Sequence, residues 1–104
     1  MLLGLALGLS GSPAAAETQG MALARSNVCL GCHQVEARRV GPPFRSIAQR
    51  YAQGEDRNAT ITYLIAAIQQ GGRGKWGAIG MPMQPQVGDA DARALAEWIL
   101  NLAP

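Results

Sequence analysis

Hydrophobic residues recur at helical spacing in four segments of the chain, and no segment alternates hydrophobic and polar residues as a strand would. Gly71-Gly72 would stop the third segment, and Asp89 is a good N-cap for the fourth. The pattern therefore predicts an all-α fold of about four helices. We expect them over residues 18–30, 44–51, 60–70 and 89–102, with a charged turn at 54–58 before the third.

The N-terminal residues have the character of a secretory leader. Residues 2–9 are leucine and alanine broken by glycines, too short to span a bilayer, and Ala14-Ala15-Ala16 offers a signal peptidase its small-residue site before Glu17. No Lys or Arg precedes Leu2, so the positive region is reduced to the initiator amine or the true start lies upstream. We predict a signal peptide at 1–16, a domain at 17–104, a periplasmic location and no stable membrane insertion after cleavage. A frayed apolar N-terminus or an uncleaved interfacial anchor is the alternative.

The domain that would remain, residues 17–104, is short and rich in alanine, so few larger hydrophobic side chains are left to build a core. Natural domains of this size recruit disulfides, metals or cofactors. The net charge is +2, from 9 Lys and Arg against 7 Asp and Glu, and the chain carries no polybasic run. Nucleic-acid binding therefore has no electrostatic support.

The sequence Cys29-Leu30-Gly31-Cys32-His33 holds both cysteines and the only histidine of the chain. This spacing is the attachment signature of c-type haem. Two thiols three positions apart on one helical turn can add to the two vinyl groups of a haem, and the next residue places an imidazole over the iron. We therefore predict one haem c, covalently attached through Cys29 and Cys32.

Other uses of the cysteine pair stay open but fit less well. A thioredoxin-like dithiol expects strands alternating with helices, which the pattern lacks. Zinc needs four ligands, and two cysteines with one histidine leave the fourth to a carboxylate or water. A disulfide across so small a loop adds little stability and would leave His33 without a purpose.

Residues 71–88 show no periodicity, which is unusual for so long a stretch of a compact domain unless it is functional. A phosphate-binding loop would need Ser or Thr after Lys75, but Trp76 follows it. We predict instead a loop that wraps a haem, with glycines for close backbone approach and prolines that fix a methionine sulfur. Met81 would be the sixth iron ligand, and Met83, also flanked by prolines, is the alternative.

Several short motifs occur together in a recognisable order. The haem motif, Val40-Gly41-Pro42, Trp76-Gly77, Met81-Pro82 and a C-terminal helix that carries Trp98 resemble those of the small bacterial class I cytochromes c. The resemblance covers nearly all of the chain after the leader. It is greatest to the short periplasmic monohaem cytochromes that deliver electrons to terminal oxidases or nitrite reductases, and it implies about four helices wrapped around one covalently bound haem.

The resemblance implies a role for individual residues around the iron. His33 would be the proximal ligand, with its other ring nitrogen donating to the carbonyl of Pro42. Met81 would be the distal ligand, and this pair of ligands raises the reduction potential relative to two histidines. Gln84 falls where relatives often carry an asparagine that donates to the methionine sulfur. Trp76 would donate its indole N–H to a haem propionate.

One expected partner of the propionates is missing. Relatives commonly add an arginine from the third helix, but residues 64–68 offer no cation here. The second propionate partner is therefore left open.

The implied coordination points to electron transfer, because imidazole and sulfur together leave no open position on the iron for a substrate. The resemblance implies a monomer, not an enzyme, that takes electrons from a membrane cytochrome bc-type donor and passes them to a terminal oxidase or nitrite reductase. Docking would use a small apolar contact at an exposed haem edge. The alternatives are a haem subunit held within a larger oxidoreductase and a five-coordinate haem sensor or enzyme.

Overall fold

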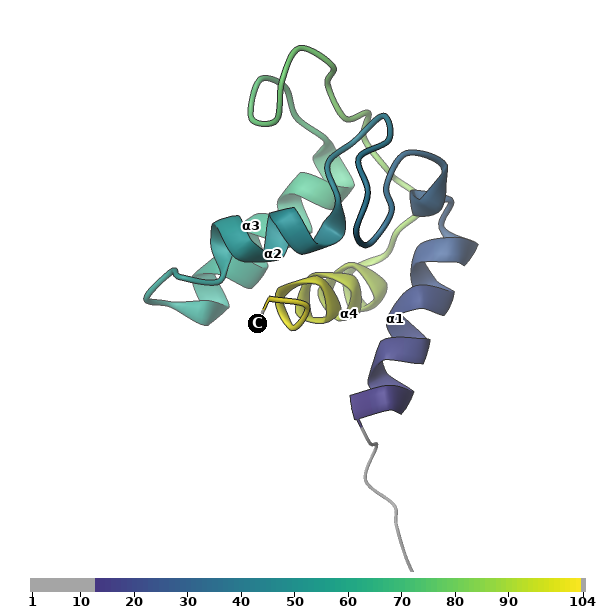
Figure 1. The fold of residues 1–104 in the computed structure, drawn as a ribbon, viewed down its shortest axis with the longest axis vertical. Coiled ribbons are helices and arrows are strands. Elements are labelled where there is room, and N and C mark those ends of the chain that lie inside the picture. Colours follow the sequence, from purple (N-terminus) through teal and green to yellow (C-terminus); the bar gives the residue numbers. More distant parts are fainter. Residues whose placement is uncertain (1–12, 104) are drawn as a thin grey trace, which may run out of the picture.

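The computed structural model describes residues 13–103, and its helices confirm the all-α prediction (Figure 1). No strand occurs in this part of the chain. Of the predicted leader, residues 1–12 lie outside the described range, and residues 13–16 form the first turn of the first helix. The elements are α1 (Pro13–Ser26), the short 3-10 turn η1 (Cys29–Gly31), α2 (Phe44–Tyr51), α3 (Arg57–Gln70) and α4 (Asp89–Leu100).

The C-terminal helix α4 is the centre of the fold. It packs against α1, α2 and α3, and Figure 1 shows it between α1 on one side and the α2 and α3 pair on the other. Burial of one helical face supplies most of the folding free energy of such an element. The buried residues of α4 are Ala92, Leu95, Ala96, Trp98, Ile99 and Leu100.

Trp98 packs the C-terminal helix against α1. A Cβ atom on Gly20 of α1 would lie 2.1 Å from Trp98 Cγ, so only glycine allows this close an approach. On its other side the indole meets the ring of Phe44 edge-on, at a centroid distance of 5.3 Å. Ala24 is fully buried in the same cluster. The contact that sequence reasoning missed is the one with Gly20.

The first helix is shorter at its C-terminal end than predicted, because it ends at Ser26 and does not continue into Leu30. The Asn27 side chain donates to Leu23 O at 2.9 Å and satisfies one of the terminal carbonyls. Val28 then adopts the left-handed conformation at φ 65°, which breaks the helical path. The cysteine motif consequently begins on a separate turn.

Two helix starts also differ from the prediction. The third helix begins inside the predicted charged turn, because the Asp56 carboxylate caps it by accepting from Ala59 N at 3.1 Å. Asp89 is not the N-cap of α4 but its first residue, after Gly88. Its carboxylate instead accepts from Gln69 Nε2 at 2.9 Å, which ties α3 to the start of α4.

Candidate haem site

A largely apolar cavity opens between two loops that stand on the helices. Residues 28–44 form one wall and residues 71–84 the other, while Leu64 and Ile68 of α3 and Leu95 of α4 close the space between them. All seven residues predicted for the site line this one cavity. They are Cys29, Cys32, His33, Pro42, Trp76, Met81 and Gln84.

The imidazole of His33 is held in one orientation. Its side chain is only 7% exposed, and Nδ1 lies 2.7 Å from Pro42 O, the bond that the resemblance implied. A carbonyl oxygen can only accept, so Nδ1 carries the proton of the neutral ring and Nε2 keeps its lone pair for a metal. The ring also stacks on Phe44 at a centroid distance of 5.0 Å.

Gly41 makes room for this imidazole. A Cβ atom at position 41 would lie 2.6 Å from His33 Cε1 and 2.9 Å from Nδ1, closer than side-chain atoms approach. The same glycine donates from its backbone nitrogen to Cys32 O at 2.7 Å. The Val40-Gly41-Pro42 segment therefore folds back over the cysteine motif, and a larger side chain in its middle would displace the ring.

The two cysteines lie on and beside η1, and no disulfide joins them. Cys29 is half-buried and Cys32 is exposed, and His33 N donates to Cys29 O at 2.9 Å, so the motif is one compact turn. Burial raises the pKa of the Cys29 thiol above its ordinary value. Redox dithiols depend on a lowered thiol pKa, so this shift does not favour a thioredoxin-like function.

Two glycines hold Met81 in the opposite wall. Gly72 N donates to Met81 O at 3.0 Å and Met81 N donates to Gly72 O at 2.8 Å, which closes the loop between them. Gly71 has a positive φ of 73°, and a Cβ atom there would lie 2.3 Å from Met81 O. Gly71-Gly72 therefore does more than stop α3. Met83 is 61% exposed and is not part of the cavity wall.

Gln84 lines the cavity, but its hydrogen bonds differ from the expected one. Its Nε2 donates to Pro82 O at 3.2 Å, and its Oε1 accepts from Gln86 Nε2 at 2.7 Å. A bond from Gln84 to a methionine sulfur is not among those that the described residues form. The amide thus braces the methionine loop from within in this structure.

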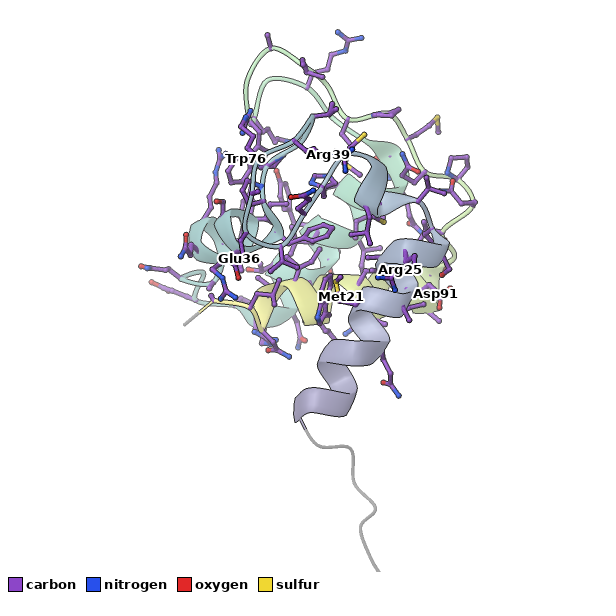
Figure 2. The ribbon with its side chains drawn as sticks, turned by 45° about the vertical axis from the view of Figure 1, so that its right-hand side comes forward. Met21, Arg25, Glu36, Arg39, Trp76 and Asp91 are labelled. Atoms are coloured by element: carbon purple, nitrogen blue, oxygen red, sulfur yellow. The ribbon has the colours of Figure 1, made fainter. Side chains whose placement is uncertain are left out.

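Trp76 stands at a basic end of the cavity. The guanidinium of Arg50 lies 4.5 Å from the centroid of the indole ring, and Arg38 Nη2 donates to Trp76 O at 3.0 Å. Figure 2 shows Trp76 and Arg39 in the half of the molecule away from the beginning of α1. Arg38 and Arg50 come from different parts of the chain, so the helical periodicity of the sequence could not predict that both contact Trp76.

These residues fit a haem. The apolar walls suit a porphyrin, the imidazole and the thioether offer two different iron donors, and the cysteine turn lies at the cavity edge. The basic end suits the propionate carboxylates. Among residues 13–103 no three His, Cys, Asp or Glu side chains gather so as to hold a metal ion.

Comparison with known proteins decides the family. The model of the family described as cytochrome c matches residues 17–103. The chain belongs to the cytochrome c family. It is 50% identical over 80 residues to cytochrome c-552 of Nitrosomonas europaea, which covers 77% of this chain and 75% of that protein. It is 41% identical over 100 residues to cytochrome c-551 of Stutzerimonas stutzeri, with 94% and 91% of the two chains covered.

The fold agrees with solved structures of this cytochrome c family. The crystal structure of wild-type Nitrosomonas europaea cytochrome c552 superposes with a TM-score of 0.74, at 49% identity, covering 79% of this chain and 98% of that one. The chain is thus a small class I monohaem cytochrome c, an electron carrier and not an enzyme, and its two cysteines are consistent with one covalently bound haem c. Within residues 13–103 no helix has the length and hydropathy needed to cross a bilayer.

Proposed function

We propose that this cytochrome is a periplasmic single-electron carrier whose iron is ligated by His33 and Met81. The observation that carries the proposal is that a buried imidazole with a fixed tautomer and a half-buried thioether line one apolar cavity from two different loops. When bound, haem c supplies a one-electron iron couple.

The protein side chains give that couple its character. The bond to Pro42 O increases the basicity of His33 at Nε2 and fixes the plane of the ring. The thioether of Met81 is a weak, neutral donor that favours the reduced metal. With His33 and Met81 both holding the iron, no coordination position would be left for oxygen, peroxide or a substrate, so the bound haem would exchange electrons only.

Partners would meet the mouth of the cavity. Val28 is 71% and Ile79 69% exposed, and both belong to the cavity wall, so apolar side chains surround the opening. We propose a cytochrome bc-type donor and a terminal oxidase or nitrite reductase as acceptor, each bound through a small transient contact by a monomer. Two ionised propionates offset the net charge of +2, so the electron-transfer rate should depend only weakly on ionic strength.

The ligand assignment is tested with holoprotein made in cells that attach haem. The ferric protein should show a weak band toward the red end of the visible spectrum that reports the sulfur–iron bond. Met81→Ala should abolish the band and allow carbon monoxide to bind the ferrous form at neutral pH. Met83→Ala is the matched control and should change neither property, because Met83 is not part of the cavity wall.

Two results would contradict the proposal. If Met83→Ala removes the band and Met81→Ala does not, the ligand is Met83. If the unsubstituted ferrous protein binds carbon monoxide readily, the iron has an open position and the five-coordinate alternative holds.

A further inference from the structure

The basic end of the cavity carries more positive charge than the protein itself neutralises. Lys75 and Trp76 line the cavity there, and no Asp or Glu is among the residues described as lining it. In the described part of the chain, the acidic partners of the ion pairs are Glu36 and Glu97, which pair with other cations. Uncompensated positive charge at one end of an apolar cavity suits a ligand that brings its own carboxylates.

Lys75 is held in place at both ends. Its backbone oxygen accepts from Arg50 Nη1 at 2.5 Å, while the same guanidinium stacks on Trp76. Its ammonium lies 5.1 Å from the centroid of the Tyr63 ring. The position of this cation is therefore set by contacts from both α2 and α3.

Two phenol groups stand beside this ammonium. Tyr63 and Tyr51 approach each other with their hydroxyl oxygens 3.4 Å apart, and both rings line the cavity. The hydrogen bond from Tyr51, together with Lys75, holds the pKa of Tyr63 below its ordinary value. Burial raises the pKa of Tyr51, which keeps this hydroxyl protonated and able to donate.

The helix that relatives were expected to use for this purpose contributes no charge to the cavity. The α3 residues in the cavity wall are Tyr63, Leu64, Ala67 and Ile68. We propose that the Lys75 ammonium binds a haem propionate in place of a cation on α3, with the Tyr63 hydroxyl beside it. Arg50 acts as a positioning residue that holds the Lys75-Trp76 segment. The inference rests on the proposed haem site and identifies the second propionate partner within it.

A cation close to a carboxyl lowers its pKa, and removing the cation raises the pKa again. The charged and titratable groups around the proposed carboxylate are Arg50 and Tyr51 from α2, Tyr63 from α3, Arg38 from the segment before α2, and Arg73 and Lys75 from the loop after α3. Arg73 and Lys75 are the cations in the cavity wall, and Lys75 is the one that adjoins Trp76 and places its ammonium over the Tyr63 ring. Its removal should therefore have the largest effect on propionate ionisation.

The test measures the midpoint potential of the holoprotein against pH, where propionate ionisation produces a step. Lys75→Gln should move the step to higher pH by about one unit, and Lys75→Arg should restore it. Arg93→Gln is the matched control, because it makes the same charge change on α4 at a residue paired with Glu97 and outside the cavity wall. It should leave the step in place.

The inference is overturned if Lys75→Gln moves the step no further than Arg93→Gln does. It is also overturned if Arg50→Gln moves the step while Lys75→Gln does not, since the stacked guanidinium would then be the cation. The visible spectrum keeps the two proposals apart. Absence of the sulfur–iron band from the unsubstituted protein would contradict ligation by Met81. The step in midpoint potential requires only attached haem, so it would still test the role of Lys75.

Discussion

The two loops that face the cavity are held by different means. The loop with His33 is anchored by buried side chains, since the imidazole bonds to Pro42 O and stacks on Phe44, which itself packs on Trp98. The loop with Met81 is held by hydrogen bonds to backbone atoms, from the Gly72–Met81 pair and from the Arg38 and Arg50 side chains. Damage to the first loop should therefore disturb the core, while damage to the second should change the iron ligand and leave the fold intact.

The largest effect is expected at Gly41. Gly41→Ala places a Cβ atom 2.6 Å from His33 Cε1 and should lower the free energy of unfolding by about 2–3 kcal/mol, from overpacking and loss of the bond to Pro42. Denaturant unfolding of the holoprotein measures this. Gly88→Ala is the control, because a Cβ atom there meets nothing within 4 Å. Equal losses in the two variants would show that Gly41 is not shaped around the imidazole.

A smaller loss, confined to the methionine side, should follow from Gly71→Ala. The substitution combines a positive φ of 73° with a Cβ atom 2.3 Å from Met81 O, and we expect a cost of about 1–2 kcal/mol. The sulfur–iron band should weaken while far-ultraviolet circular dichroism stays unchanged. Gly72→Ala, with open space around its Cβ position, should keep the band. If Gly71→Ala unfolds the whole protein, the two loops do not differ in how strongly they are coupled to the core.

Replacing Val28, whose backbone is strained, should give a modest gain in the free energy of unfolding. A β-branched residue with φ 65° is strained, and its side chain is 71% exposed, so little packing is lost on replacement. Val28→Asn should raise the free energy of unfolding by about 1 kcal/mol, because asparagine tolerates this conformation. Thermal unfolding of the holoprotein would show it. A lower midpoint would mean that Val28 packs against the bound group more than it strains the chain.

The smallest effect concerns a surface pair beside the histidine loop. Arg45 donates to both Glu36 oxygens, and this bond holds the pKa of Glu36 below its ordinary value of 4.5. Because the folded state lowers the pKa of Glu36, its carboxylate stabilises the fold at pH values above the ordinary pKa. This stabilisation is lost as the pH falls through the lowered, folded-state pKa. Glu36→Gln should therefore lower the unfolding temperature slightly at neutral pH. It should also make the unfolding temperature fall less steeply as the solution is acidified. Glu55→Gln is the control and should leave the fall of the unfolding temperature at acid pH unchanged.

Local chemistry made much of the site predictable. The cysteine motif, His33 and Met81 occur in an order that few folds use, and all reach one cavity. The bond from His33 to Pro42 was also expected and is present. The cysteine motif and the methionine loop could be predicted from residue type and spacing within short stretches of chain, whereas the bond to Pro42 was implied by the family resemblance.

Features that depend on particular side-chain contacts were missed. The helical periodicity of the sequence continues past Ser26, so the first helix was predicted too long. The periodicity contains no information on the side-chain bond of Asn27 at the end of the helix. The stack of Arg50 on Trp76 joins residues far apart in sequence and appears only when α2 meets the loop. Gly20 looked like an ordinary helical position until the indole of α4 was placed against it.

A continuous row of aromatic rings connects the contact between α1 and α4 to the proposed iron ligand His33. Gly20 admits Trp98, whose indole supports Phe44, and Phe44 supports the imidazole of His33. The first and last helices must therefore associate before the ring acquires its final support. If His33 ligates the iron as proposed, a change in the packing of the C-terminal helix should therefore reach the ligand field of the metal through these rings.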